Sequence, residues 1–228
     1  MLITIPQVLA PDRLAELRAL LDGAGDAWVD GLATAGYQGA TVKHNQQIDE
    51  ASPVAARAGD LVLAALERHP AFISAALPAQ VYPPMFNRYG EGMAFGPHVD
   101  GSIRLHPQTG AKLRTDVSAT LFLNDPADYD GGALRIMDTY GLHEVKLAAG
   151  DLVLYPATSL HQVTPITRGT RLASFFWVES LIRDDLRRSL VHDLDTAIQR
   201  LNQTGADRAA CDTLIGCYHN LMRQWGET

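Results

Sequence analysis

Apolar residues near the start of the chain recur at the spacing of a helix. Leu14, Leu17 and Leu21 follow Pro11 at steps of three and four residues, and Gly23 comes soon after. This spacing places the leucines on one face of a helix, and proline and glycine are common at helix starts and ends. The pattern therefore predicts a helix that begins at Pro11 and ends before Gly23.

Helical patterns return later in the chain. Residues 53–69 predict a second helix, and Ser52 is a suitable N-cap because its hydroxyl can accept a hydrogen bond from a free backbone N–H. Residues 184–201 carry apolar side chains at steps of four, and residues 209–225 are typical of a final helix. An apolar stripe must be covered, so we expect these last helices to pack against the rest of the protein or a second copy. The stripe consists of Leu186, Leu190, Leu194 and Ile198.

Between residues 80 and 178 the pattern changes to the short runs that are typical of strands. About eight runs rich in β-branched and aromatic residues alternate with turn signals such as residues 89–92 and 130–132. The gaps between the runs are too short for the helices of a parallel α/β sheet. The pattern therefore predicts an all-β sandwich or barrel. The runs are 85–89, 94–99, 117–123, 133–137, 144–147, 152–155, 162–166 and 172–178.

These patterns divide the chain into three parts. Residues 1–79 are expected to form an N-terminal support region of strand and helices, residues 80–180 the β core, and residues 181–228 a C-terminal helical segment. The expected fold class is mainly β with flanking helices. The length of 228 residues and the 46% share of hydrophobic residues fit one large domain, or one domain with a helical appendage.

Charge and composition argue against several classes of partner. The net charge is -7 and no long basic run is present, so the surface on average repels nucleic acid. No segment approaches the roughly 18–20 apolar residues that cross a bilayer, and the first residues lack the features of a signal peptide. We therefore expect a cytoplasmic protein with no nucleic-acid partner and no membrane partner.

Cysteine usage limits the kind of metal site that the chain can form. The two cysteines, Cys211 and Cys217, lie six residues apart near the end of the chain and on different faces of the predicted helix. This arrangement excludes a disulfide framework and argues against a cysteine metal site. Any metal is therefore expected to bind through histidine and carboxylate.

The sequence His98-Val99-Asp100 places a histidine and a carboxylate two residues apart. On a strand, alternate residues share a face, so these two side chains can converge on one ion. A second histidine would complete the ligand set of two imidazoles and one carboxylate that non-haem Fe(II) oxygenases use. The chain has 8 histidines, however, and such a pair also arises by chance, so the surrounding sequence must decide.

Longer blocks of sequence surround this pair. Residues 87–101 read Asn-Arg-Tyr-Gly-Glu-Gly-Met-Ala-Phe-Gly-Pro-His-Val-Asp-Gly, and residues 161–171 read His-Gln-Val-Thr-Pro-Ile-Thr-Arg-Gly-Thr-Arg. They resemble the Tyr-x-x-Gly-x-x-Φ-x-x-His-x-Asp block and the distal His-x-Val-x-Pro-Val-x-x-Gly-x-Arg/Lys block of the prolyl-hydroxylase-like 2-oxoglutarate oxygenases. Linking strands match in the right order at residues 121–124, 129–134 and 150–156.

The end of the chain narrows the resemblance. Residues 176–184 read Phe-Trp-Val-Glu-Ser-Leu-Ile-Arg-Asp, and residues 190–195 read Leu-Val-His-Asp-Leu-Asp. Together with Lys-His-Asn-Gln-Gln at residues 43–47, they are similar to the bacterial PKHD-type hydroxylases, a branch associated with iron-uptake loci. The resemblance then covers nearly the whole chain, and only the tail is specific to the branch.

The resemblance implies a double-stranded β-helix, or jelly-roll, core that binds Fe(II), 2-oxoglutarate and O₂, with ascorbate as a reductant. The metal ligands would be His98, Asp100 and His161. Arg171 would bind the distal carboxylate of 2-oxoglutarate, and Tyr89 would help to orient this co-substrate. The implied reaction couples decarboxylation of 2-oxoglutarate, to succinate and CO₂, to hydroxylation of a substrate.

Arg171 also has a physical argument of its own, because a charge buried in a barrel needs a partner of opposite sign. The distal carboxylate of 2-oxoglutarate supplies one in a bidentate fork, and an internal acid of the protein is the alternative. Arg171 follows His161 by ten residues, so we expect the two on adjacent strands joined by the turn at 167–170. Arg168, which precedes Gly169, is expected to be an exposed turn residue.

Three lesser features complete the expectations. Some relatives place a tyrosine where Phe122 stands, so carboxylate binding here would depend more on Arg171 and Tyr89. Phe175 and Trp177 share a strand face and are expected to be core residues. Residues 102–114, directly after the His-x-Asp pair, form either a substrate lid or a solvated connection.

Other functions stay open at this point. A non-catalytic, cupin-like protein would hold a metal or small ligand on the same barrel, but it would be expected to lack a triad member or Arg171. A metal-dependent hydrolase or isomerase would not need Arg171. The substrate is a protein side chain, a free amino acid or a siderophore-like small molecule, and a homo-oligomer is compatible with the sequence.

Overall fold

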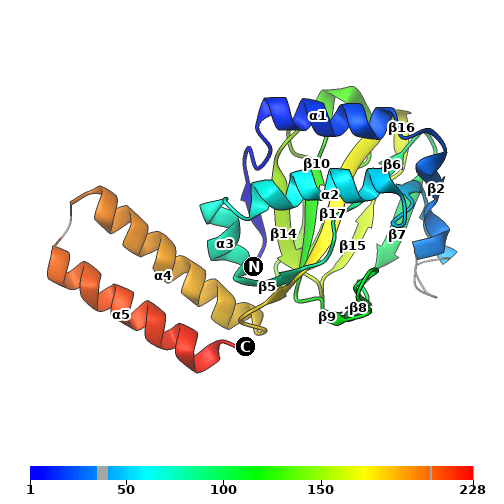
Figure 1. The fold of residues 1–228 in the computed structure, drawn as a ribbon. Helices are drawn as coiled ribbons and strands as arrows, with labels where there is room; N and C mark the ends of the chain where they lie inside the picture. Colours follow the sequence, from blue (N-terminus) through cyan, green and yellow to red (C-terminus); the bar gives the residue numbers. More distant parts are fainter. Residues whose placement is uncertain (35–40, 206, 228) are drawn as a thin grey trace.

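Two antiparallel sheets face each other in the computed structural model, which describes residues 1–34, 41–205 and 207–227 (Figure 1). They form the expected jelly-roll core. The larger sheet has the order β1-β14-β10-β17-β6-β4-β2, and β5 also pairs with β17. Its strands are β1 (Ile3–Ile5), β2 (Trp28–Asp30), β4 (Gln46–Ile48), β5 (Pro78–Val81), β6 (Met85–Tyr89), β10 (Val117–Phe122), β14 (Leu152–Pro156) and β17 (Arg171–Ser180).

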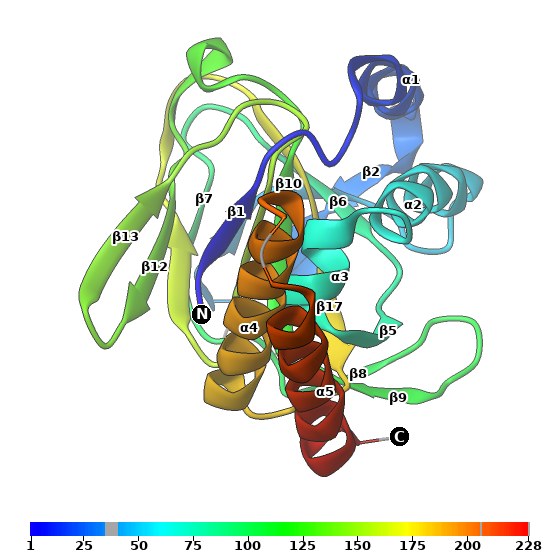
Figure 2. The ribbon, with the colours of Figure 1, turned by 90° about the vertical axis from the view of Figure 1, so that its left-hand side faces the viewer.

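The smaller sheet has the order β13-β12-β15-β7-β3 and lies opposite, as the view in Figure 2 shows. Two further strand pairs, β11–β16 and β8–β9, extend the ends of the core. The strands of the smaller sheet are β3 (Lys43–His44), β7 (Ala94–His98), β12 (Leu134–Asp138), β13 (Gly141–Val145) and β15 (Leu160–Val163). The remaining strands are β8 (Ile103–Leu105), β9 (Lys112–Arg114), β11 (Tyr129–Gly131) and β16 (Ile166–Gly169).

Most of the predicted strands are confirmed to within one or two residues, but two predictions were wrong in detail. The run 162–166 is not one strand, because β15 ends at Val163 and β16 begins at Ile166. Pro165 between them has no backbone N–H to continue a ladder. The run 144–147 is displaced, since the observed strand β13 is an edge strand at Gly141–Val145 whose side chains are largely exposed.

Helices α1 (Pro11–Asp22) and α2 (Pro53–Leu66) cover the outer face of the larger sheet. Both were predicted, and the Ser52 hydroxyl accepts a hydrogen bond from the Ala55 N–H at 3.1 Å, which confirms the cap. The second helix is shorter than expected. The residue before a proline avoids the helical region, and a separate helix, α3 (Pro70–Ala76), begins at Pro70.

Alternation along β17 separates the two sides of the larger sheet. Leu172, Phe176 and Val178 belong to the hydrophobic core between this sheet and the helices. Arg171, Phe175 and Trp177 have the opposite parity and line the space between the sheets. One face of β17 therefore contributes to the main hydrophobic core, and the other face lines the space between the two sheets.

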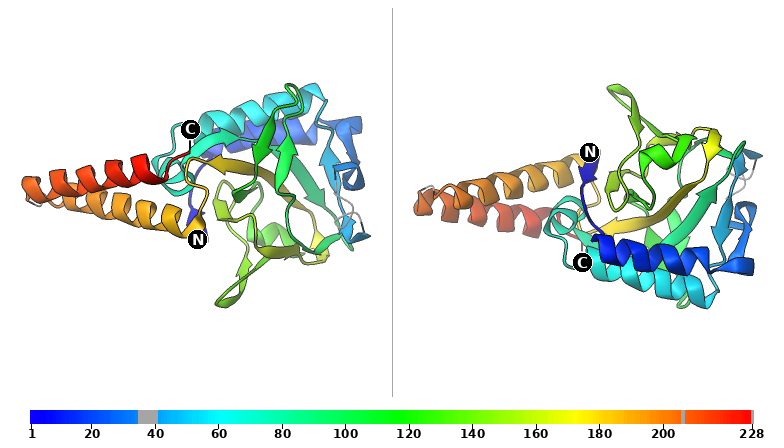
Figure 3. Two further views of the ribbon diagram at one scale, coloured as in Figure 1. Left: turned by 90° about the horizontal axis from the view of Figure 1, so that it is seen from below. Right: turned by 90° about the horizontal axis from the view of Figure 1, so that it is seen from above.

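The C-terminal helices α4 (Asp185–Gln203) and α5 (Arg208–Trp225) form a hairpin that projects away from the core (Figure 3). Its base is anchored by a hydrophobic cluster that includes Leu77, Ile182 and Val191. At the same place, the Ser74 hydroxyl on α3 donates to the Asp195 carboxylate at 2.6 Å and lies 2.9 Å from the Nδ1 of His192. No helix among the described residues has the length and apolar character to span a bilayer.

The expectation that the apolar stripe of the α4 helix is covered is confirmed only in part. Ile198 is buried between the helices, but Leu186 and Leu190 are 70% and 50% exposed. The hairpin therefore depends on its base for attachment to the core.

Truncating Ile182 at that base is expected to destabilise the protein. Its side chain is fully buried, so Ile182→Ala removes methyl groups and leaves a cavity, which typically costs about 2–5 kcal/mol. Leu186→Ala on the exposed turn of α4 is the control and should change the free energy of unfolding by less than about 0.5 kcal/mol. Urea unfolding of both variants measures this, and equal values would contradict the assigned anchor.

Candidate active site

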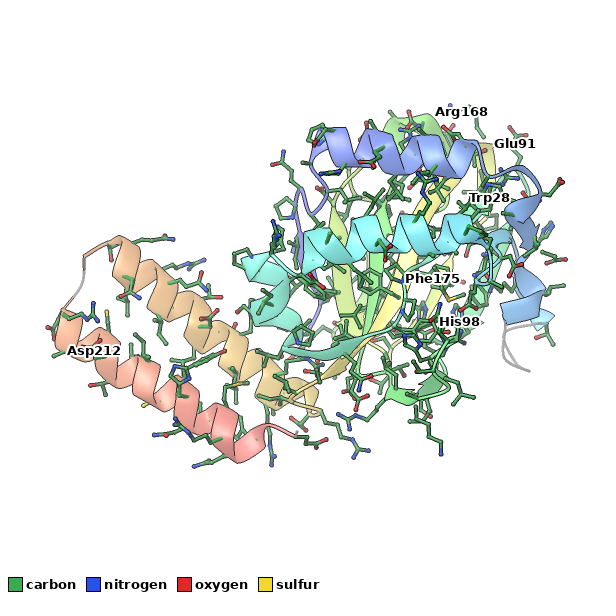
Figure 4. All side chains as sticks on the ribbon, viewed as in Figure 1. Trp28, Glu91, His98, Arg168, Phe175 and Asp212 are labelled. Atoms are coloured by element: carbon green, nitrogen blue, oxygen red, sulfur yellow. The ribbon has the colours of Figure 1, made fainter. Side chains whose placement is uncertain are left out.

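A cavity of about 740 Å³ lies between the two sheets and contains all five residues singled out in the sequence. Each sheet contributes one cross-strand pair to it. His161 on β15 is opposite His98 on β7 in the smaller sheet, and Arg171 on β17 is opposite Tyr89 on β6 in the larger one. Figure 4 labels His98 and Phe175, which line this cavity from different sheets.

Three candidate metal ligands converge at one end of this cavity. The Nε2 atoms of His98 and His161 lie 3.9 Å and 3.7 Å from the two carboxylate oxygens of Asp100. One donor atom from each residue lies within 4.8 Å of the others. Asp100 does not share a strand with His98, as the spacing had suggested, because β7 ends at His98 and Asp100 follows in the next loop.

Hydrogen bonds orient each of these three side chains. The Nδ1 of His98 lies 2.8 Å from the Gly96 carbonyl oxygen, and the Nδ1 of His161 lies 3.0 Å from the Ser159 carbonyl oxygen. A carbonyl only accepts, so each Nδ1 carries the proton and donates it, which leaves both Nε2 atoms with a free lone pair. The Ser118 hydroxyl donates to Asp100 Oδ2 at 2.6 Å.

The environment keeps His98 neutral. Burial and, to a smaller extent, the nearby His161 lower its pKa from 6.5 to about 4, against the opposing effects of the Gly96 carbonyl and Asp100. The ring of Phe95 stacks on the imidazole with the ring centroids 3.5 Å apart. A metal ligand must be deprotonated, so a neutral imidazole with an exposed Nε2 fits that role. The donor set of two imidazoles and one carboxylate fits Fe(II).

Arg171 is buried at 1% exposure without a carboxylate partner among the described residues. Its Nε and Nη1 atoms have no hydrogen-bond partner there, and the rings of Phe122 and Tyr89 lie beside it, with centroids 5.2 Å and 5.5 Å from the guanidinium carbon. Within the described residues no acid neutralises this charge, so the structure gives no support to the salt-bridge alternative. An uncompensated buried cation is costly, and a bound anion would remove the cost.

The expected position of Arg171 relative to His161 was also wrong. The two are not on adjacent strands, because β16 intervenes and pairs with β11 at the end of the core. Arg171 therefore lies on the sheet that faces His161 and not beside it. Arg168 is exposed as predicted and forms an ion pair with Asp130 at 2.7 Å, away from His98 in Figure 4.

Two tyrosines near Arg171 were missed in the sequence. Tyr155 on β14 lines the cavity, and burial together with the charge of Asp100 raises its pKa well above 10. Burial also raises the pKa of Tyr129, whose hydroxyl is close enough to Arg171 for that charge to act on it. Phe122, where a tyrosine was noted as absent, packs its ring against the same guanidinium. Alternation within the predicted strand 152–155 was the only signal for Tyr155.

The outer part of the cavity has aromatic walls. Phe175 and Trp177 were expected in the core, and they do belong to a small hydrophobic cluster with Tyr82 and Met85. They also line this space together with Arg104. The guanidinium carbon of Arg104 lies 4.6 Å from the Trp177 ring and 5.1 Å from the Tyr82 ring. Residues 102–114, expected to be a lid or a solvated connection, form the hairpin β8–β9 that brings Arg104 into the wall.

Comparisons with known proteins agree on one family. The 2OG-Fe(II) oxygenase superfamily matches residues 84–179, and the PKHD-type hydroxylase C-terminal domain matches residues 185–227. A PKHD-type hydroxylase of Cupriavidus metallidurans is 69% identical over 228 residues, which is 100% of both chains.

Solved structures share the fold at low sequence identity. A prolyl hydroxylase from Trichoplax adhaerens, in complex with a hypoxia inducible factor peptide fragment, is 17% identical with a TM-score of 0.56 and covers 83% of this chain and 86% of its own. HygX from Streptomyces hygroscopicus, with nickel, 2-oxoglutarate and hygromycin B bound, is 18% identical with a TM-score of 0.53 and covers 78% and 82%.

Removing the charge of Arg171 is expected to stabilise the ligand-free protein. Arg171→Met keeps an apolar chain of similar length but removes a buried cation that has no carboxylate partner among the described residues. Replacing even paired buried charges by apolar residues is often neutral or stabilising by about 1–4 kcal/mol, so a gain of this size is expected. Chemical denaturation without ligands measures the change, and Arg168→Met on the surface should stay within about 0.5 kcal/mol of the wild type. A clear loss of stability in Arg171→Met would mean that the fold itself compensates the charge.

Proposed function

Because this chain belongs to the PKHD-type hydroxylases of the 2OG-Fe(II) oxygenase superfamily, we propose that His98, Asp100 and His161 hold its Fe(II) and that Arg171 binds its 2-oxoglutarate. The protein is a 2-oxoglutarate-dependent hydroxylase; the assignment of individual residues is the proposal. The observation that carries it is the buried guanidinium of Arg171, which has no carboxylate partner among the described residues and lines the same cavity as the three candidate ligands.

Each proposed residue has a separate task. When bound, Fe(II) and 2-oxoglutarate supply the oxidative chemistry that uses O₂ to hydroxylate the substrate and releases succinate and CO₂. The neutral imidazoles of His98 and His161 present Nε2, and Asp100 contributes one negative charge, a set that leaves open positions for the co-substrate and O₂. Ser118 holds the Asp100 carboxylate in place. A supporting hydrogen bond of this kind typically tunes metal affinity.

The co-substrate would span the cavity between the sheets. The planar guanidinium of Arg171 matches the distal carboxylate in a bidentate fork, and the low dielectric of the site strengthens this pair. Tyr89, its cross-strand neighbour, is buried, and burial raises its pKa, so its hydroxyl stays protonated and can donate a hydrogen bond to help orient the co-substrate. Ascorbate would act as an external reductant that keeps the iron in the Fe(II) state.

Two other parts of the interpretation are proposals as well. The division into residues 1–79, 80–180 and 181–228 is supported by family matches at 84–179 and 185–227. A role in iron uptake rests on the resemblance of the tail alone. A non-catalytic cupin-like protein is the weaker candidate, because a protein that only stores a metal has no need for a buried arginine beside it.

The metal assignment predicts that His98→Ala and His161→Ala each abolish stoichiometric Fe(II) binding. Each substitution removes one of three protein ligands, while the fold should persist because the surrounding strands pair through their backbones. Anaerobic calorimetry with Fe(II) measures the effect. His143→Ala, at an exposed histidine that bonds Asp138, is the control and should bind iron as the wild type does. Unchanged affinity in either site variant would refute the assignment.

The co-substrate assignment predicts that Arg171→Gln weakens 2-oxoglutarate binding by at least roughly 30-fold. Breaking a buried charge pair typically costs about 2 kcal/mol or more, and each 1.4 kcal/mol is tenfold in affinity. Arg171→Lys should be intermediate, because it keeps the charge and loses the fork. Iron affinity should hardly change.

Arg168→Gln is the matched control, since Arg168 is exposed three residues earlier and bonds Asp130. Its affinity for 2-oxoglutarate in the presence of metal should equal that of the wild type. If Arg171→Gln binds 2-oxoglutarate normally, the clamp lies elsewhere. If the wild type has no affinity for 2-oxoglutarate with metal present, the non-catalytic cupin-like protein replaces the proposed function.

A further inference from the structure

The cavity carries more positive charge than the proposed function uses. Three cationic side chains line it, Lys43, Arg104 and Arg171, and Asp100 is the one carboxylate among the described lining residues. Under the proposed function, the charges of the divalent metal and the 2-oxoglutarate dianion cancel each other. Asp100 then offsets one of the three lining cations, and Glu50 and Asp30 act on Lys43 from outside the lining. Arg104 is the lining cation beyond the Arg171 site that forms no ion pair among the described residues.

Arg104 is fixed in place without a carboxylate. Its guanidinium lies against Trp177 and Tyr82, and one Nη atom lies 3.9 Å from the sulfur of Met85. It forms no ion pair within the part of the chain that the structure describes. A guanidinium has five N–H donors, so the contacts of Arg104 with Met85 and Tyr82 leave other donors available. Arg104 is therefore positioned to donate hydrogen bonds into the cavity.

Lys43 lies on β3 of the smaller sheet and is only 8% exposed. Burial and the charge of Arg104 lower its pKa to about 8, while Asp100, Glu50 and Asp30 act in the opposite direction. Both cations line the same cavity, where the Lys43 Nζ lies 5.4 Å from the centre of the Phe95 ring. Cations that share a partly dry cavity repel each other, and an anion bound there would relieve this repulsion.

The walls beside these cations are apolar and aromatic. Phe175 and Trp177 follow each other on the cavity face of β17, with ring centroids 5.8 Å apart, and Phe175 also lines the space that His98 reaches. Asn87 on the neighbouring strand has a buried side-chain oxygen without a hydrogen-bond partner among the described residues. The site therefore combines cationic groups, an apolar surface and an unpaired polar group in one cavity.

We propose that the substrate is a small organic anion whose carboxylate or phosphate binds between Arg104 and Lys43 and whose apolar body lies along Phe175 and Trp177. This inference rests on the proposed function, since it assigns Asp100 and Arg171 to the metal and the co-substrate. The burial of Lys43 places the anion inside the cavity, which suits a small molecule. Arg104 and Lys43 are substrate-binding residues and carry no chemical step.

The test uses the full-length protein loaded with Ni(II) and saturating 2-oxoglutarate, which prevents turnover and fills the Arg171 site. Calorimetry or ligand-observed NMR compares phenylacetate and phenyl phosphate with the neutral phenylacetamide. At least one of the two anions should bind about tenfold or more tightly than the amide, since a hydrogen bond to a charged group typically contributes that much. The better anion identifies which oxyanion the site prefers.

Variants locate the anion. Arg104→Gln should lower the ratio of anion affinity to amide affinity at least about tenfold. Arg104→Lys should retain part of this ratio because the charge remains. Lys43→Met should also reduce it. Lys112→Gln is the matched control, because Lys112 is exposed on the paired strand of the same hairpin. All variants should bind 2-oxoglutarate as the wild type does.

Two outcomes overturn the proposal. Either the anions bind no better than the amide, or their advantage survives intact in Arg104→Gln. Both are read in protein that has already bound 2-oxoglutarate, so a failure here leaves the proposed function untouched. A failure of the proposed function would appear earlier, as a lack of 2-oxoglutarate binding to the metal-loaded protein.

Discussion

The pairing of β17 with strands on both sides is the constraint on which the rest of the structure depends. β17 forms ladders with β10 on one edge and with β6 and β5 on the other. A slip of one residue would exchange its two faces, turning Arg171 toward the helices and Phe176 into the cavity. Such a slip is disfavoured because it would move the charged Arg171 into the apolar core and remove Phe176 from it. The hydrophobic core and the candidate site are therefore stabilised by the same set of backbone hydrogen bonds.

The site gains its shape from the separation of the two sheets. Facing sheets pack about 10 Å apart, which leaves room for side chains or for a small ligand between them. The metal candidates His98 and His161 lie on one sheet, and Arg171 lies on the other. In the proposed assignment, a short diacid with metal-binding groups at one end and a carboxylate at the other bridges the gap. Neither sheet alone carries a complete binding site.

The sequence predicted the fold class, most strands and the five candidate site residues, because these depend on local alternation and on motifs of fixed spacing. It missed what depends on distant contacts. β17 is buried on both faces, so its pattern did not show that the core residues Phe175 and Trp177 also line the cavity. Residues 162–166 were interpreted as one continuous strand, but the chain breaks at Pro165. The extra strand β16 places Arg171 on the sheet opposite the one that carries His161.

The sequence did not predict that Lys43 and Arg104 line the cavity, for a similar reason. Lys43 and Arg104 lie 61 positions apart in the chain, on a short edge strand and on a hairpin, and neither element has a strong periodic pattern. Only the folded chain brings them to one cavity. Tyr155 was missed although its strand was predicted, because alternation alone does not say which face of a strand meets a cavity.

The projecting hairpin of α4 and α5 has a consequence for the dynamics of the molecule. The described part of its outer half projects away from the core, and Asp212 lies far from His98 in Figure 4. Segments with few contacts to the core open locally with a smaller free energy than global unfolding. The backbone amides of the outer turns should therefore exchange with solvent hydrogen before those at the base near Val191, while the sheets around the cavity stay closed.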